Sequence, residues 1–227
     1  MEPRAPWFSQ ESAAETKARA RKVLGVLRKA YPDAKTALNH SSPFELLVAT
    51  VLSAQSTDKK INEITPALFA RFPGPREFLA SKPGEIETAI KQSGFFNQKA
   101  RSIRGLSRVL VEEFGGEVPS TMEELLRLPG VARKTANVVL ANAFGINVGI
   151  AVDTHVHRLS WRFGFSSEND PVKVEQDLMA LFPRTRWFDV THLLIEHGRT
   201  VCSARTPACG DCPVARSCPA SRAGSDR

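Results

Sequence analysis

The sequence predicts an all-α protein built from many short helices, and three observations support this class. Apolar residues recur every three or four positions through most of the 227 residues, no segment alternates convincingly with period two, and no hairpin turn joins two β-branched runs. Residues 148–152 are the only strand-like stretch, and one short strand makes no sheet. With 42% hydrophobic and 24% charged residues, the chain can bury a core and is not predicted to be disordered.

Apolar residues at helical spacing predict the first helix over residues 23–30, and Pro32 stops it. Residues 1–22 lack the apolar run of a signal peptide and contain three acidic residues, which argue against a transit peptide. We expect a frayed extension there. No stretch approaches the roughly 20 apolar residues that cross a bilayer, so we expect a soluble intracellular protein.

Two helices follow in the next forty or so residues. Ser42-Pro43 opens one whose side chains are apolar almost all round, as in a central buried helix. Thr57 offers an N-cap for the other, and the Pro73-Gly74-Pro75 stretch breaks the chain after it.

A basic amphipathic helix is expected next, with Asn97 as its cap and Gly115-Gly116 as its end. Its apolar residues should face inward and its cations outward. The segment from Thr88 to Val111 has no acidic residue and contains the cations Lys91, Lys99, Arg101, Arg104 and Arg108. The chain carries a formal net charge of +7, and such a one-sided field suits a polyanion, so nucleic acid is the first partner to consider.

The second half of the chain continues in short helices. Ser120-Thr121 opens one that Pro129-Gly130 terminates, and the next begins near Arg133 and runs to Gly145. Three later helices are expected over residues 153–163, 172–181 and 189–199.

The segment Leu-Pro-Gly-Val-Ala-Arg-Lys-Thr-Ala, residues 128–136, joins two predicted helices. Gly130 permits a sharp reversal, after which backbone N–H groups point outward at a helix N-terminus and can bind phosphate. Such contacts fix position without reading base sequence. Most Pro-Gly turns between helices are only structural, so this motif needs support from other features.

Lys134 and Asp153 are the candidate reactive pair. A deprotonated lysine can attack a sugar C1′ and form a Schiff base, whereas the alternative for Lys134 is a simple phosphate contact. Asp153 either caps the next helix or takes a proton from Lys134 and stabilises a sugar cation. His155 and His157 lie on different faces of a helix, so we expect them to pack or hydrogen-bond rather than bind a metal.

All four cysteines lie in one short segment with the spacing Cys-x6-Cys-x2-Cys-x5-Cys, as Cys202, Cys209, Cys212 and Cys218. No secretory signal supports disulfides, so the cluster indicates metal binding. Zinc ribbons usually have two Cys-x2-Cys pairs, and one pair with a further ligand on each side better suits an iron–sulfur cubane.

The order and spacing of these motifs resemble those of the endonuclease III family, within the helix-hairpin-helix DNA glycosylase superfamily. The likeness extends from about Tyr31 to the last cysteine. It is carried by residues 41–47, residues 52–58, the hairpin through Lys134, the Val-Asp-Thr-His segment at 152–155, and the four cysteines. The resemblance implies a 4Fe-4S cluster on Cys202, Cys209, Cys212 and Cys218.

The same resemblance implies two helical lobes with a DNA-binding cleft between them. One lobe is a six-helix barrel with the helix-hairpin-helix motif, expected over residues 35–147. The other is an iron–sulfur cluster lobe formed by residues 1–34, an extension and a helix, together with residues 148–227.

The activity implied is that of a bifunctional enzyme of base excision repair. An oxidised pyrimidine is flipped out of duplex DNA, Lys134 displaces it at C1′, and the Schiff base undergoes β-elimination, with Asp153 assisting. The partner would be double-stranded DNA containing an oxidised pyrimidine or an abasic site. We expect a monomer that binds no membrane and works at the nucleoid in a bacterial cytoplasm.

The resemblance also implies a set of DNA contacts, which are Gln55, Phe95, Gly130, Ala132, Arg133 and Arg205. Gln55 and Phe95 would fill the gap left by the extruded base. Two of these positions depart from the family pattern. Ala132 stands where a second glycine is expected and fits only with a negative φ. The Phe95-Phe96 pair is bulkier than an aliphatic wedge, which could alter the opposite-base preference.

Two alternative functions stay open at this point. A monofunctional adenine or mismatch glycosylase of the same superfamily would share the cluster and the aspartate, but it would lack Lys134. A non-catalytic DNA-binding module would use the hairpin for phosphate and the cysteines for zinc. It would form no covalent intermediate and would leave Asp153 as a helix cap.

Overall fold

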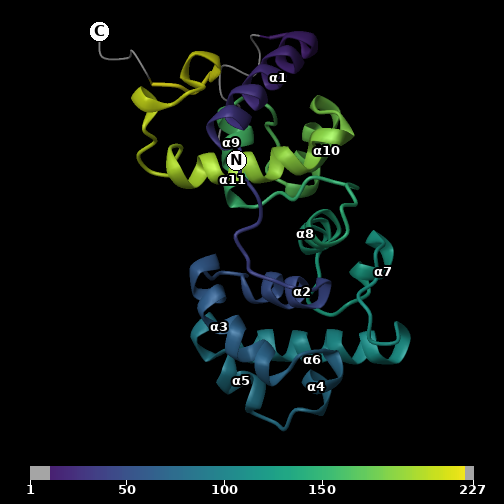
Figure 1. Ribbon diagram of the computed structural model, residues 1–227. Helices are drawn as coiled ribbons and strands as arrows, with labels where there is room; N and C mark the ends of the chain where they lie inside the picture. Colours follow the sequence, from purple (N-terminus) through teal and green to yellow (C-terminus); the bar gives the residue numbers. More distant parts are fainter. Residues whose placement is uncertain (1–10, 223–227) are drawn as a thin grey trace. The chain divides into compact units, whose positions relative to one another are not determined.

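The computed structural model describes residues 11–222 and confirms the all-α class, since this range contains no strand (Figure 1). Within it no helix combines the length and apolar character that a membrane span needs. The helices in chain order are α1 (Ala13–Ala30), α2 (Pro43–Leu52), α3 (Asp58–Arg71), α4 (Pro75–Ala80), α5 (Glu85–Ala89), α6 (Phe96–Glu113), α7 (Met122–Leu126), α8 (Arg133–Ala143), α9 (Thr154–Arg162), α10 (Pro171–Leu181) and α11 (Trp187–Thr200), with the 3₁₀ helices η2 (Lys91–Ser93), η3 (Arg184–Arg186), η4 (Cys209–Asp211) and η5 (Ala215–Ser217).

The described residues form two compact units, each with its own apolar core. The middle unit is Thr36–Val148 and contains α2 to α8. The terminal unit joins residues 11–35 to residues 149–222 and contains α1 and α9 to α11.

Helix α2 is the buried helix of the middle unit, as predicted. Its N-cap is Ser42, whose hydroxyl accepts the N–H of Glu45 at 3.2 Å, and Pro43 occupies the first turn. Its remaining residues are all buried, and it contacts α3, α6 and α8. A helix that is apolar on every side needs such neighbours on every side.

Helix α6 is the predicted amphipathic helix, and α4 lies beside it (Figure 1). Ile103, Leu106 and Leu110 are completely buried. At its C-terminus the N–H of Gly116 donates to the carbonyl of Leu110 at 2.8 Å, with positive φ at both Gly115 and Gly116. The predicted glycine stop is therefore confirmed.

Two predictions for α6 are wrong. The N-cap is Phe95 rather than Asn97, because Phe95 adopts a left-handed φ of 47° and its carbonyl accepts the N–H groups of Gln98 and Lys99, which places Asn97 inside the helix. Lys99 does not face outward, since the residue is only 5% exposed. Its ammonium instead donates to the carbonyl of Ser93 at 2.7 Å.

Periodicity predicts no helix between Pro75 and Asn97, whereas the structure has α4, α5 and η2 there. These elements have six, five and three residues. They are shorter than the stretch over which a 3.6-residue period can be recognised.

Helix α1 begins at Ala13, so the expected frayed extension is wrong for residues 13–22. Ser12 and Glu15 form a capping box, in which the N–H of Glu15 donates to Ser12 Oγ and the N–H of Ser12 donates to Glu15 Oε2. Most side chains of residues 13–22 are exposed, which explains why no apolar period marks them. Residues 1–10 of the predicted extension lie outside the described residues.

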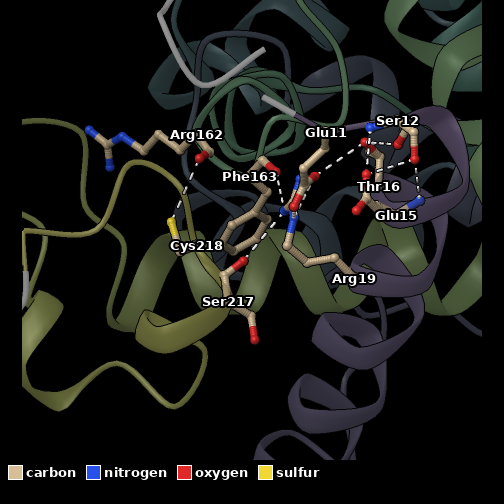
Figure 2. Close-up of polar contacts among 9 residues, drawn as sticks. All are labelled: Glu11, Ser12, Glu15, Thr16, Arg19, Arg162, Phe163, Ser217 and Cys218. Atoms are coloured by element: carbon tan, nitrogen blue, oxygen red, sulfur yellow. Dashed lines mark hydrogen bonds and ion pairs between the residues drawn. The ribbon is translucent and has the colours of Figure 1, made fainter. Parts of the chain in front are cut away.

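Arg19 ties α1 to two segments of the terminal unit that are distant in sequence (Figure 2). Its Nη1 donates to the carbonyl of Phe163 at 2.6 Å and to that of Ser217 at 3.4 Å, while its Nη2 pairs with the Glu11 carboxylate at 2.7 Å. Because Ser217 precedes Cys218, α1 holds the loop that carries the last cysteine.

Helices α9, α10 and α11 confirm the three helices predicted for the end of the chain, to within two residues at each boundary. They pack with α1 around the second apolar core. Phe163, the C-cap of α9, and Leu178 of α10 are among its fully buried side chains.

Candidate functional site

The predicted hairpin lies in the middle unit, between α7 and α8. Gly130 has a φ of 80°, and a Cβ added to it would lie 2.6 Å from the Cβ of Ser102, so only glycine fits. Ala132 is the N-cap of α8 with a φ of −97°, so alanine is accommodated without strain. Alanine offers no side-chain acceptor for the first N–H groups of α8, and a ligand anion could accept from them.

Lys134 is the second residue of α8 and is exposed, with Arg133 half-buried before it. The long side chain therefore starts at the helix N-terminus and extends into solvent. An accessible amine next to a group of outward-pointing backbone amides could reach a sugar whose phosphate those amides hold.

Gln55, Phe95 and Gly130 line one pocket of about 240 Å³ in the middle unit. Its remaining lining residues are Val51, Ala54, Gln98, Lys99 and Ser102. The structure thus brings three of the predicted DNA contacts to one place. Their meeting depends on tertiary packing, since they come from the end of α2, the start of α6 and the hairpin.

Gln55 and Phe95 are the two non-glycine residues with a positive φ within residues 11–222, at 55° and 47°. A left-handed conformation of this kind costs about 1–3 kcal/mol and is concentrated at functional sites. Phe95 is also 63% exposed, which is unusual for a large aromatic ring. Backbone strain and exposure therefore coincide at the rim of this pocket.

Asp153 lies in the terminal unit as the N-cap of α9. Its Oδ1 accepts the N–H groups of His155 and Val156, each at 2.8 Å. The capping role is therefore real, and it uses one of the two carboxylate oxygens. His155 bonds to Arg158 through Nδ1 and His157 to the carbonyl of Asn169 through Nε2, which confirms the expectation of hydrogen bonding for both histidines.

The four cysteines line one cavity of about 420 Å³ in the terminal unit. All four are free thiols. Cys202 follows α11, and Cys209, Cys212 and Cys218 come from the turns around η4 and η5. Across residues 11–222, no three His, Cys, Asp or Glu side chains converge closely enough to hold a single metal ion.

Two basic side chains that sequence patterns did not single out contact these cysteines. Arg162 Nη1 lies 3.1 Å from Cys202 Sγ, and the same guanidinium donates to the carbonyls of Ser203 and Ala204 at 2.7 Å each. His197, five residues before Cys202, lies with Nε2 3.5 Å from Cys212 Sγ.

The His197 ring also bonds to Tyr31, whose hydroxyl lies 2.9 Å from Nδ1. Burial lowers the pKa of His197 to about 4, so the ring is neutral at pH 7. The neutral ring carries one proton, and the tautomer that accepts from Tyr31 at Nδ1 carries it on Nε2, the nitrogen that lies beside the Cys212 sulfur.

Burial raises the pKa of the Cys218 thiol to about 11 and also raises the pKa of Cys212. Buried thiols of this kind become thiolates when a bound metal compensates the negative charge. Arg205, the predicted DNA contact in the cysteine segment, is exposed beside the same cavity.

Comparison with known proteins gives a consistent result. Residues 48–184 match the model of the HhH-GPD superfamily base excision DNA repair proteins. The endonuclease III of Synechocystis is 52% identical over 210 residues, covering 92% of this chain and 96% of that protein. The Bacillus subtilis endonuclease III is 46% identical over 189 residues, covering 83% and 86%.

Among solved structures, a trapped covalent intermediate of endonuclease III with DNA superimposes with a TM-score of 0.87 at 42% identity. The match covers 90% of this chain and 96% of that one. The chain therefore belongs to the endonuclease III family of the HhH-GPD superfamily of base excision DNA repair proteins.

Proposed function

We propose that the chain is a bifunctional DNA glycosylase and AP lyase that removes oxidised pyrimidines from duplex DNA. Its family acts in base excision repair. The observation that carries the bifunctional mechanism is Lys134, an exposed amine in the first turn of α8, directly after a hairpin suited to phosphate. The relative trapped as a covalent intermediate with DNA supports the same chemistry.

In the proposed reaction the Lys134 amine attacks C1′ of the flipped nucleotide, and the bond from C1′ to the base breaks. The base leaves with the electron pair and takes up a proton, while the amine gives a proton to Asp153. The bond from C1′ to O4′ then breaks, O4′ takes up a proton, and a Schiff base remains between C1′ and Nζ. Loss of a C2′ proton then expels the 3′ phosphate by β-elimination, and water releases the lysine.

Asp153 would take part as a carboxylate in this reaction. Its Oδ1 is held by two backbone N–H groups, which fixes the orientation of the side chain. A fixed carboxylate can accept the amine proton and stabilise positive charge that develops on the sugar. Capping and catalysis are therefore compatible roles for one residue.

We also propose that Gln55 and Phe95 fill the space vacated by the extruded nucleotide. Their joint position at one pocket, their strained backbones and the exposure of the Phe95 ring support this role. An aromatic ring can stack on the neighbouring bases and so offset the cost of unstacking. Gly130, Ala132 and Arg133 at the hairpin, and Arg205 near the cysteines, would contact the DNA backbone.

The cysteine cavity supports a 4Fe-4S cluster on Cys202, Cys209, Cys212 and Cys218. All four thiols line this one cavity, and one Cys-x2-Cys pair with a further ligand on each side suits an iron–sulfur cubane better than a single zinc ion. When bound, the cluster would cross-link the segment after α11 and so stabilise the fold. Arg162 and His197 would direct N–H groups at two of its thiolate ligands.

On this proposal the terminal unit is the cluster lobe and the middle unit is the helical barrel that carries the hairpin. The partner is double-stranded DNA with an oxidised pyrimidine or an abasic site, bound by a monomer. The curated relatives named above come from bacteria, which supports a place at the bacterial nucleoid in the cytoplasm.

Borohydride trapping on duplex DNA tests the proposed reaction. Wild type, Lys134→Ala and the control Lys29→Ala, which removes an exposed lysine of α1, are incubated with thymine glycol DNA or abasic DNA. We expect adducts on both substrates for wild type and for the control, and none for Lys134→Ala. DNA affinity of Lys134→Ala should persist, since the backbone contacts remain.

Other outcomes separate the alternatives. An adduct on abasic DNA alone would leave a lyase that acts on a different base lesion. The absence of any adduct, from protein with its full iron content, would favour a monofunctional glycosylase or a DNA-binding module. Undiminished strand cleavage by Lys134→Ala would contradict the assignment of the nucleophile.

A further inference from the structure

Lys99 is a buried lysine that the proposed reaction does not use. It is 5% exposed, and its Nζ donates to the carbonyl of Ser93 at 2.7 Å. Among residues 11–222 no carboxylate pairs with it. A buried ammonium is costly to keep in a fold, and here burial lowers the pKa of Lys99. We therefore expect the Lys99 side chain to hold a local backbone conformation that the neighbouring residues do not hold by themselves.

The turn that Lys99 contacts is the one that carries Phe95. Ser93 ends η2, Gly94 follows with a φ of 70°, and Phe95 then adopts its left-handed φ of 47° before α6 begins. The carbonyl of Phe95 accepts the N–H groups of Gln98 and Lys99, each at 3.1 Å. The turn is thus attached to α6 at two points. The carbonyl of Phe95 accepts two backbone N–H groups of α6, and the carbonyl of Ser93 accepts the Lys99 ammonium.

This double attachment explains how a strained phenylalanine is maintained. A left-handed non-glycine residue persists only where its surroundings over-determine the conformation. The α6 N–H groups hold the carbonyl of Phe95, the N–H of Ser93 donates to the carbonyl of Ile90 at 2.8 Å, and Ser93 Oγ donates to the carbonyl of Gly94 at 3.3 Å. The Lys99 ammonium adds the bond to the carbonyl of Ser93, six residues away in sequence.

The Lys99 ammonium is bonded to the carbonyl of Ser93 and the residue is only 5% exposed, so the contact that the structure gives it is to the turn. The pocket geometry indicates what the side chain does. Lys99 and Phe95 line the same pocket as Gln55 and Gly130, with the Phe95 ring largely exposed at its rim. The lysine therefore acts from inside the pocket on the backbone that presents the ring.

We propose that Lys99 is the positioning residue for Phe95, holding the 93–95 turn so that the ring is ready to enter the DNA stack when a nucleotide is extruded. This inference rests on the proposed gap-filling role of Phe95. A preorganised ring lowers the entropy that must be lost when the damaged base leaves the helix. Loss of Lys99 should slow extrusion from duplex DNA and leave the chemistry at Lys134 intact.

The test compares four variants with wild type, which are Lys99→Met, Phe95→Ala, the double variant and Lys82→Met. Methionine preserves the length and apolar stem of lysine without the donor. Lys82→Met removes an exposed lysine of the same unit that lies outside the basic segment, and it serves as the matched control for charge. Lys99→Leu, which also lacks the donor, replaces Lys99→Met if that variant fails to fold.

Single-turnover excision is measured on duplex DNA with thymine glycol, with 2-aminopurine beside the lesion to report extrusion. Borohydride trapping is measured on a single-stranded abasic oligonucleotide, which has no gap to fill. We expect Lys99→Met and Phe95→Ala each to slow duplex excision and the 2-aminopurine signal about tenfold to a hundredfold. The double variant should be no slower than the slower single variant. Single-strand trapping by every variant, and duplex excision by Lys82→Met, should match wild type.

Each contrary outcome has a distinct meaning. Wild-type excision by Phe95→Ala would overturn the gap-filling role, and with it the basis of this inference. Slow Phe95→Ala with wild-type Lys99→Met would overturn only the positioning role of Lys99. Additive losses in the double variant, or an equal loss on single-stranded DNA, would show that Lys99 acts elsewhere and would also overturn the positioning role.

Discussion

The two units hold their candidate functional residues by different means. In the middle unit, exposed side chains such as Phe95 stand on unusual backbone, with positive φ at Gln55, Phe95 and Gly130. In the terminal unit, the cysteines lie on short turns, and nitrogens of the half-buried Arg162 and the buried His197 contact two of their sulfurs. Backbone geometry fixes the first site, whereas a side-chain network fixes the second. Replacing an exposed side chain of the first site should therefore affect mainly activity, whereas replacing a cysteine of the second site should affect mainly stability.

The largest effect should follow loss of a cysteine from the terminal unit. Cys218→Ser should reduce iron and sulfide content and expose residues 201–222 to limited proteolysis, because four ligands hold the proposed cluster. The fragment covering residues 36–148 should resist the protease, since it has a separate core. Ser217→Ala, at the neighbouring position, is the control. Stoichiometric zinc with no iron in wild type would contradict the cluster assignment.

Asp153 is an exception to this contrast between the two units, because it belongs to the terminal unit but is proposed to act in catalysis. The variant Asp153→Asn tests that exception. Asparagine is as good an N-cap as aspartate, so its amide oxygen can still accept from His155 and Val156. We expect an unchanged melting temperature and excision slowed about 10²- to 10⁴-fold in single-turnover assays. Excision at the wild-type rate would make Asp153 only a cap.

Gly130→Ala should damage the hairpin of the middle unit. The substitution forces a Cβ to 2.6 Å from Ser102 at a φ of 80°, so a loss of about 2–4 kcal/mol is expected in urea unfolding. DNA affinity should also fall as the amides of α8 move. Gly25→Ala is the matched control, because a Cβ there meets nothing within 4 Å and alanine favours a helix. Equal stability of the two variants would contradict the structure of the hairpin.

The smallest effect at neutral pH concerns His192 in the terminal unit. Burial lowers its pKa to about 4, with Asp189 and Asp153 opposing the shift and Arg199 adding to it. The folded state therefore favours the neutral ring. The contribution of His192 to the free energy of unfolding is complete above pH 6.5, the ordinary pKa of histidine, and it is lost as the pH falls towards 4. The loss should reach about 3 kcal/mol near pH 4.

His192→Gln removes the titrating group, so its stability should fall less steeply than that of wild type between pH 6.5 and 4. Urea unfolding followed by circular dichroism across this range measures the difference. Parallel curves for the two proteins would mean that His192 keeps its ordinary pKa in the fold.

Local signals predicted most of the helices correctly. The caps at Ser42, Thr57 and Thr121 are short-range hydrogen bonds between a side chain and a nearby amide, so the sequence alone reveals them. The capping box at Ser12 carried an equally local signal for the start of α1, and the exposed residues after it hid that signal from an analysis of apolar spacing. Helices α4 and α5 are too short to show a period.

The site was predictable only in part. The cysteine cavity follows from sequence spacing, because four residues within one segment of 17 residues must lie close together in space. Lys99 shows the limit of such reasoning, since a cation in a basic amphipathic pattern is expected at the surface. Its burial depends on the carbonyl of Ser93 and on packing around the pocket, which no local pattern contains. The meeting of Gln55, Phe95 and Gly130 depends on the same tertiary packing.

The central claim is that Lys134 forms the covalent bond to DNA, and peptide mapping of the trapped adduct tests it most directly. Wild-type protein is reduced with borohydride on abasic duplex DNA, digested with nuclease and protease, and analysed by tandem mass spectrometry. The account predicts the sugar remnant on Lys134, with Lys99 unmodified because it is buried. A remnant on any other lysine, or on the N-terminal amine, would contradict the account.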